Sequence, residues 1–501
     1  MTKHNQSSKS LFYGSIDLIL VIISIFTIII ATLYPFNFSI PENYSLQALF
    51  NHFDNTSFFQ DQVNNVLLFM PFGLGLTSIL LRRQIQGLNQ IVVVAIASAS
   101  LSFSVEFLQS FLPSRDPTPA DIINNTFGGF VGLLCFYIWD SRSFNSTINY
   151  LENTQASNSL KKVTVFFTGY ILLTFLMGFS WENNVSLREW NTNFSLIIGN
   201  EKTGDRAWQG SVSQLLFADK AISNNEVKEV FNNPDSLQAG SNSLLAIYQL
   251  NGKDNYRDST GQLPELLWQG QSKPQVIDNK KGVDITPTRW LQSAEPVKLI
   301  NQRISETSQF TVRAKFATAN LNQNGPARII SLSRDSLHRN LTIGQDNKDL
   351  ALRLRTPITG QNGSDIKLSV PNFFADTNPH RIIMTYTKAK LQVYVDKSEN
   401  VYSFNLLELL PNNQKVFSYA VTFIPLGLCL ALLSIIAKRQ YNFNRFMVPC
   451  GIFLPSLIVE AFLIHQSGKA LSLVNLGLGI FFTALITLLF KARTLMLGVK
   501  S

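Results

Sequence analysis

Two polar side chains near the end of an apolar segment have the types and spacing to do chemistry. The stretch VEFLQ places Glu106 and Gln109 three residues apart, on nearly the same face of a helix. Arg115 follows in the loop PSRDPTPA. A carboxylate at membrane depth is costly unless it is paired or faces water, and Glu106 lies about 9 Å below the expected helix end near Leu112. We therefore expect a polar cleft here, with a purely structural ion pair between Glu106 and Arg115 as the alternative.

Two similar motifs begin neighbouring apolar segments and add carboxylates and amides. DQVNN places Asp61 and Asn65 four residues apart, and DIINN does the same for Asp121 and Asn125. Either aspartate could instead accept hydrogen bonds from free backbone N–H groups at a helix start, and either asparagine could join two helices. We predict that three helix ends bring the candidate ligand-binding residues to one depth: Asp61, Asn65, Glu106, Gln109, Arg115, Asp121 and Asn125.

The elements that position these residues are membrane helices. Of the 501 residues 46% are hydrophobic and only 15% are charged, whereas soluble domains carry about 25% charged residues. Each apolar run is close to the twenty or so residues that a bilayer core requires. We predict eight spans, at about 16–33, 62–81, 91–112, 121–139, 163–181, 416–437, 446–465 and 471–490.

The net charge of +9 is a topology signal. The surplus Lys and Arg residues lie in short segments beside the apolar runs, which argues against a nucleic-acid-binding face. The positive-inside rule then places both termini in the cytoplasm and residues 182–410 outside the cell membrane. The three cysteines lie in apolar runs without zinc or redox spacing, so we expect neither a metal nor a cofactor.

The middle segment, 182–410, is predicted to be an inserted all-β sandwich. Alternating runs such as FTVRAKF, ARIISLS, LALRLRT and KLQVYVD are separated by turn residues. HRIIMTYTKAKLQVYVDK and AWQGSVSQLLFADKAISNNEVKEVF resemble laminin-G/concanavalin-A-like jelly-roll domains, in a circularly permuted order. Such domains often bind glycans or proteins. Trp190, Trp208, Trp268 and Trp290 are expected more often in the core than in a sugar platform, and Asp254 and Asp258 in turns rather than a calcium site.

The motifs of the first apolar segments resemble the VanZ-like membrane family. NVLLFMPFG, EFLQ, the loop arginine and DIINNTFGG carry the resemblance over about residues 15–140. The family takes its name from a protein linked to low-level resistance to the glycopeptide teicoplanin, and its biochemical activity is not established. The resemblance therefore implies a cell-envelope role more than a mechanism.

The C-terminal apolar segments, about 415–490, repeat this pattern in a degraded form. FIPLG follows FMPFG at an offset of 354 residues, and VEAFL follows VEFLQ at the same offset. Glu460 matches Glu106 and Lys469 matches Arg115, whereas Tyr419 replaces Asn65. We expect a parallel repeat in which the first copy does any chemistry.

Together these features predict a polytopic α-helical membrane protein with three parts. They are a VanZ-like domain (1–181), a β-sandwich outside the membrane (182–410) and a three-helix repeat (411–501). The leading hypothesis is a bacterial envelope protein that binds a glycan, a peptidoglycan precursor or a glycopeptide. The alternatives are a membrane enzyme acting on a lipid-linked precursor and a transporter. Apolar residues below Glu106 argue against transport, and the absence of paired-carboxylate spacing argues against a glycoside hydrolase.

Overall fold

The computed structural model describes residues 2–39, 59–112, 119–233, 243–250, 256–270 and 282–496. Arg115 and Asp254 lie outside these ranges. The chain forms two compact units. The first comprises Met1–Phe167, Leu428–Val448 and Ile486–Ser501, and the second comprises Thr168–Gly427 and Pro449–Leu485.

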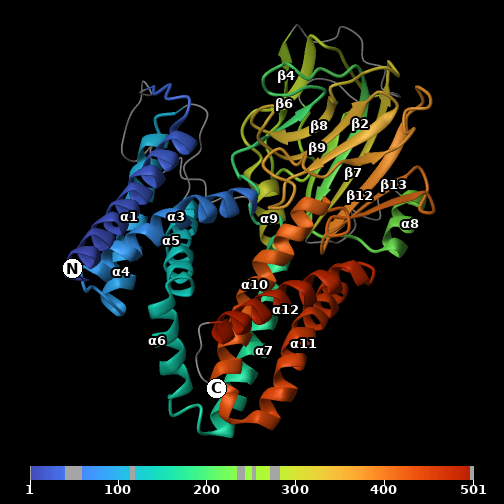
Figure 1. Cartoon of the computed structure of the whole chain (residues 1–501). Coiled ribbons are helices and arrows are strands. Elements are labelled where there is room, and N and C mark those ends of the chain that lie inside the picture. The colour runs from blue at the N-terminus through green and yellow to red at the C-terminus, as the bar shows by residue number, and fades with distance from the viewer. Residues whose placement is uncertain are drawn as a thin grey trace. The chain divides into compact units, whose positions relative to one another are not determined.

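Long apolar helices dominate both ends of the chain (Figure 1). Within the described residues, seven are long and apolar enough to cross a membrane, as expected for a multi-pass membrane protein. The eighth predicted span, 16–33, corresponds to the shorter apolar stretch Asp17–Leu33 of α1. The apolar helices are α1 (Thr2–Leu33), α3 (Phe59–Arg82), α4 (Leu88–Gln109), α5 (Pro119–Trp139), α7 (Leu160–Asn183), α10 (Asn412–Ile436), α11 (Tyr441–Ser467) and α12 (Leu473–Met496).

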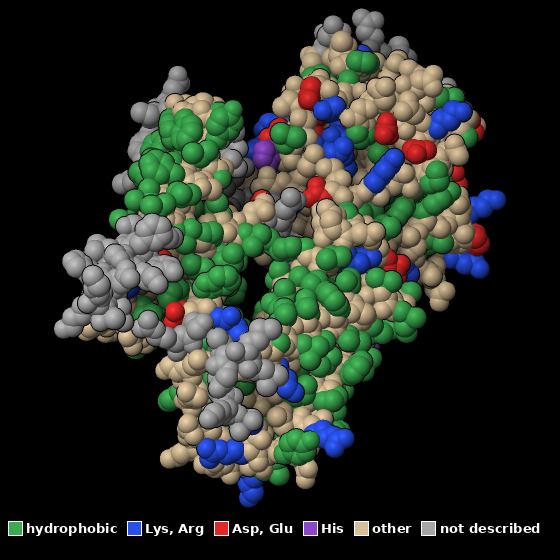
Figure 2. Space-filling view, in the orientation of Figure 1, with side chains coloured by type: hydrophobic (Ala, Val, Ile, Leu, Met, Phe, Trp, Pro, Cys, Tyr) green, Lys and Arg blue, Asp and Glu red, His purple; other side chains and the backbone are tan. Residues whose placement is uncertain are grey.

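Hydrophobic side chains cover these helices on the face that Figure 2 shows, and charged side chains gather mainly over the sheets and near helix ends. Exposed apolar residues such as Ile96 and Leu172 would contact lipid tails. A polar helix, α6 (Ser141–Glu152), follows α5, and a short 3₁₀ turn, Ala437–Arg439, follows α10.

In the first unit, α1, α3 and α4 share an apolar cluster that includes Ile28, Phe69 and Val105. Helix α5 packs closely along α3, because glycines leave room for the two backbones. A Cβ added at Gly73 would overlap the carbonyl oxygen of Gly129, and one at Gly132 would overlap that of Met70. Gly128 and Gly132, four residues apart in a GxxxG spacing, thus place one face of α5 against α3.

The second unit contains two antiparallel sheets (Figure 1), each with seven strands in the described residues. Sheet 1 has the order β11-β10-β9-β8-β1-β6-β4; sheet 2 has the order β14-β13-β12-β7-β2-β3, with β5 beside β2. Sheet 1 comprises β1 (Ser195–Ile198), β4 (Leu266–Gly270), β6 (Arg289–Ser293), β8 (Ala327–Ser333), β9 (Arg339–Asp346), β10 (Asp349–Leu354) and β11 (Leu368–Val370). Sheet 2 comprises β2 (Gly210–Ala218), β3 (Leu244–Gln249), β5 (Val283–Ile285), β7 (Phe310–Thr318), β12 (His380–Thr387), β13 (Lys390–Val395) and β14 (Val401–Asn405).

Buried tryptophans join the two sheets into a sandwich-like part. Trp208 is fully buried, donates to Gln345 of sheet 1 at 2.9 Å and contacts the ring of Phe316 of sheet 2. Trp190 is also buried and donates to the carbonyl oxygen of Arg355. The sequence therefore correctly predicts these two tryptophans as core residues, whereas Trp268 and Trp290 are half-buried.

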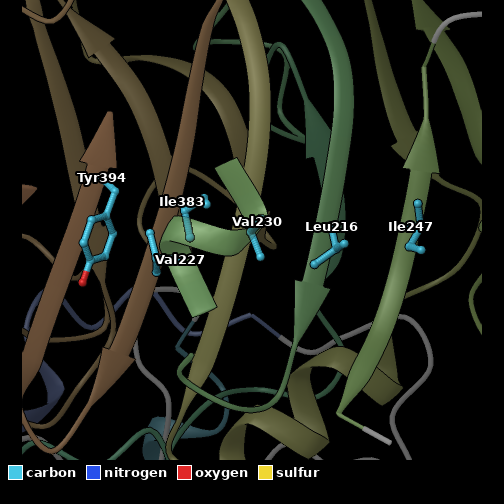
Figure 3. Close-up of a cluster of buried hydrophobic side chains, with 6 residues drawn as sticks. All are labelled: Leu216, Val227, Val230, Ile247, Ile383 and Tyr394. Atoms are coloured by element: carbon cyan, nitrogen blue, oxygen red, sulfur yellow. The ribbon is translucent and has the colours of Figure 1, made fainter. Parts of the chain in front are cut away.

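Helix α8 (Asn224–Asn232) covers the outer face of sheet 2 (Figure 3). It begins with a capping box in which Ser223 and Glu226 exchange hydrogen bonds. Val227 and Val230, three residues apart, pack with Leu216 and Ile383 of the sheet. A second short helix, α9 (Lys298–Thr307), precedes β7.

Candidate functional site

Helix α4 buries a row of polar residues and exposes large apolar ones, the reverse of a helix in a soluble protein. Its buried residues are Gln90, Val94, Ser98, Ser102, Val105, Glu106 and Gln109. Its exposed residues include Ile96, Phe103 and Phe107. Ser98, Ser102 and Glu106 are four residues apart and therefore form a polar stripe on one face.

Glu106 lies in this stripe with 3% of its surface exposed. One turn away, Ser102 accepts a hydrogen bond from the Asn125 side chain of α5 at 2.9 Å. Gln109 donates to the carbonyl oxygen of Thr32 at 3.0 Å, which fixes α4 against the end of α1. Helices α4 and α5 thus bring Glu106, Gln109 and Asn125 to one end of the bundle, beside the end of α1.

The starts of α3 and α5 meet at the same end. The Asn65 side chain donates to Asp121 at 2.8 Å, and both residues are half-buried. Asp61, one turn earlier, is exposed. The arrangement favours Asn65 as a partner for Asp121, and it leaves Asp61 at the rim of the cluster.

Two buried polar atoms of this helix pair make no hydrogen bond within the described residues: Ser98 Oγ, two turns from Glu106 along α4, and Asn125 Oδ1 of α5. Buried polar groups normally have a protein or water partner, because an unsatisfied group costs about 1–3 kcal/mol. These two atoms can form hydrogen bonds with a polar guest. The sequence reasoning missed Ser98 and Ser102, although their spacing from Glu106 is visible in the sequence.

Helix α4 is apolar overall below Glu106, as expected, but its buried face carries further polar residues. At the other end of the helix, Gln90 is buried, donates to the carbonyl oxygen of Thr77 at 3.0 Å and accepts from Tyr137 at 2.6 Å. Nearby, Asp17 of α1 accepts a hydrogen bond from Ser78 of α3 at 2.7 Å and forms an ion pair with Arg82 of α3 at 2.6 Å. A sequence scan overlooks such a stripe because the lipid-facing residues between its members dominate the local hydropathy.

The C-terminal helices contain a second buried polar cluster, in the second unit. Lys469 forms an ion pair with Glu460, and their side chains are 2% and 3% exposed. The Ser472 backbone N–H donates to the same carboxylate at 3.0 Å, and Tyr419 donates to it at 3.3 Å. Glu460 is therefore neutralised within the protein.

The described residues do not bring together three or more His, Cys, Asp or Glu side chains that could hold a metal ion. Asp258 accepts backbone hydrogen bonds from Ile247, Thr260 and Gln262, so it stabilises a turn.

Comparison with known proteins gives one family match. Residues 16–140 match the family described as VanZ/LLP1, which confirms the predicted resemblance for this part of the chain. No curated protein and no solved structure matches the chain. The second copy and the laminin-G resemblance are outside the family match and stay predictions.

Proposed function

We propose that this protein binds a polar, envelope-derived ligand through the cluster around Glu106, at the outer end of its VanZ-like helices. The main support for this proposal is that Glu106, an ionisable residue of a membrane helix, is only 3% exposed and lies in a buried polar stripe. Its ligand would be the headgroup of a lipid-linked peptidoglycan precursor or a glycopeptide such as teicoplanin. The unsatisfied atoms of Ser98 and Asn125 support a guest with both donors and acceptors.

We propose that the C-terminal helices, which repeat the pattern of the VanZ-like helices, do not bind the ligand. At the offset of 354 residues Glu460 stands at the position of Glu106, and its Lys469 partner occupies the carboxylate. An ion pair held by two further donors has little capacity left for a ligand. We infer that this copy has a structural role and does not bind the ligand.

The test compares Glu106→Gln with Ser104→Ala in the full chain. Ser104 lies on the exposed side of α4 and donates to its own helix at Ser100, so its loss should change only the lipid-facing surface. Teicoplanin susceptibility of a bacterium that expresses each variant would be measured at equal membrane abundance. Binding of a labelled lipid-linked precursor to the protein in nanodiscs would be measured in parallel. Glu106→Gln should reduce both the protein's effect on teicoplanin susceptibility and its affinity for the precursor at least tenfold. If Glu106→Gln and Ser104→Ala behaved alike, the proposal would be refuted.

The sandwich-like part would engage a glycan on the outer side of the membrane. The half-buried Trp268, with the Tyr256 ring 6.1 Å away and Arg289 over its face, is the best-placed aromatic contact. A glycan array probed with the full chain should give binding that Trp268→Ala removes. A wild-type protein that binds no glycan would eliminate this part of the proposal.

A second candidate function, movement of protons or a small polar solute, is favoured by the stripe along α4. From Glu106 to Gln90 the stripe extends 16 residues, or about 24 Å at 1.5 Å per residue, most of a bilayer core of about 30 Å. Val94 interrupts it, which argues against a continuous pathway. Proton flux into liposomes that contain the full chain, abolished by Glu106→Gln, would establish transport over simple binding.

A further inference from the structure

One face of sheet 1 is polar and bears an unusual concentration of arginines. Strand register places Ser331 beside Thr342, and Thr342 beside Arg353, so these three residues form a row across β8, β9 and β10. Arg328 is paired with Gly344, and Arg339 is paired with Ser333. Because paired residues of adjacent strands share a face, these side chains all belong to the face opposite the apolar core.

This face is buried although it is polar. Arg328 is 1% exposed, and Arg339, Ser331 and Thr342 are 0% exposed. The loop after β1 contributes Glu201, also 0% exposed, which accepts from the Ser333 hydroxyl and lies 3.5 Å from Arg328 Nε. Arginines are almost never buried in this way without a partner of opposite charge.

The charges in this cluster do not balance. Arg339 lies within electrostatic reach of Arg328, Arg353 and Arg206, and the opposing charge acting on it is Glu201. Burial, followed by repulsion from Arg328 and Arg353, lowers the pKa of Arg339 to about 9. Burial likewise lowers the pKa of Arg328 to about 10, although Glu201 opposes the shift. Glu201 is thus the carboxylate that opposes the two fully buried guanidinium groups, Arg328 and Arg339, whereas the more exposed Arg353 and Arg206 interact with Asp346 and Asp205.

Arg339 has the hydrogen-bonding capacity to hold an anion. Within the described part of the chain, its Nε, Nη1 and Nη2 atoms are buried and make no hydrogen bond. By contrast, Arg328 donates from Nη1 to the Pro326 carbonyl oxygen at 3.2 Å. A guanidinium whose donors are all available matches the two oxygens of a carboxylate, phosphate or sulfate group.

A neighbouring cavity gives a ligand an approach to the cluster. It has a volume of about 250 Å³ and borders Arg353, the member of the cluster that is only half-buried. Its polar lining includes Asp346, Asp349, Ser364 and Lys367. The rest of a ligand could occupy this cavity while its acidic group contacts the arginines.

We propose that Arg328, Arg339 and Arg353 form a binding site for an oxyanion group, either the carboxylate of an acidic sugar or a phosphate. This inference rests on the proposed glycan-binding role of the sandwich-like part and narrows its ligand to an acidic one. The site is independent of Glu106 and of the membrane cluster.

The test measures anion binding by the full chain in nanodiscs. Isothermal titration with inorganic phosphate, inorganic sulfate and glucuronate, at constant ionic strength set by sodium chloride, compares the wild type with four variants. Arg339→Met removes the available donors. Arg334→Gln is the control, because Arg334 is a half-exposed arginine in the turn between β8 and β9, just before Arg339. Glu201→Gln removes the competing carboxylate, and Glu106→Gln tests independence from the membrane cluster.

We expect at least one oxyanion to bind the wild type and to raise its unfolding temperature. Arg339→Met should weaken this binding at least tenfold, Glu201→Gln should strengthen it, and the other two variants should leave it unchanged. The opposite signs of the first two separate a lost site from general misfolding. Stronger binding of glucuronate indicates an acidic glycan, and stronger binding of phosphate indicates a phosphate group.

Two results would overturn the site: no oxyanion effect beyond that of chloride, or equal effects in the wild type and Arg339→Met. If neutral glycans still bound the full chain on an array, the proposed function would survive this failure. Conversely, phosphate binding without any array signal would support the site and remove the glycan role.

Discussion

Breaking the buried Lys469–Glu460 pair should strongly destabilise the C-terminal helices. The side chains are 2% and 3% exposed, so water cannot replace a lost partner. Within the described part of the chain, Lys469→Met would leave Glu460 with the Ser472 N–H and the Tyr419 hydroxyl as its donors. Removing one member of a buried pair costs about 3–5 kcal/mol, which lowers the folding equilibrium constant roughly 10²- to 10³-fold or more.

Replacing both members should cost far less. In the double variant Lys469→Met, Glu460→Met no charge is left buried, and such replacements are often neutral or stabilising by about 1–4 kcal/mol. The exposed pair Lys438–Glu152, 2.9 Å apart with Lys438 39% exposed, provides the control. Lys438→Met should cost only about 0–1 kcal/mol.

The assay is unfolding of the full chain in mixed micelles with increasing sodium dodecyl sulfate, followed by tryptophan fluorescence. The single variants should unfold at a much lower detergent fraction than the wild type, and the double variant should recover most of the difference. If Lys469→Met unfolded with the wild type, or if the two single effects simply added, the pair would not be buried as described.

Two further predictions concern backbone packing and pH. Gly73→Ala should cost about 1–3 kcal/mol, since its Cβ would overlap the Gly129 carbonyl oxygen, whereas Gly169→Ala meets nothing within 4 Å and should be neutral in the same micelle assay. A 2.7 Å hydrogen bond to Asp396 raises the pKa of His380, so its stabilising effect is complete below about pH 6.5 and is lost as the pH rises through the raised value. The unfolding temperature of the full chain should therefore fall over this range less steeply in His380→Asn than in the wild type; equal slopes would contradict the assignment.

The sequence by itself determined the elements. Apolar runs of about twenty residues can be read locally, so it located the seven long helices, and alternating runs such as ARIISLS and KLQVYVD became strands. The VanZ-like segment was also evident, because its motifs lie close together along the chain.

Part of the candidate site was evident from helix spacing. Glu106 and Gln109 are both buried on one face of α4, as their separation of three residues implied. The contact of Asn65 with Asp121, 56 residues later, depends instead on how α3 and α5 cross. That crossing is set by the glycine contacts between the two backbones.

Only the tertiary structure decided which faces are buried and which charges meet. The pattern of β10 does not show that Arg353 meets other arginines, and it is strand register that brings Arg353 within electrostatic reach of Arg328 and Arg339 on the two neighbouring strands. On α4 large apolar side chains are exposed, whereas Gln90, Ser98, Ser102, Glu106 and Gln109 are buried. The local sequence pattern sets the periodicity of a helix or strand. Whether a given face is buried depends on the segments that pack against it, which come from distant parts of the chain.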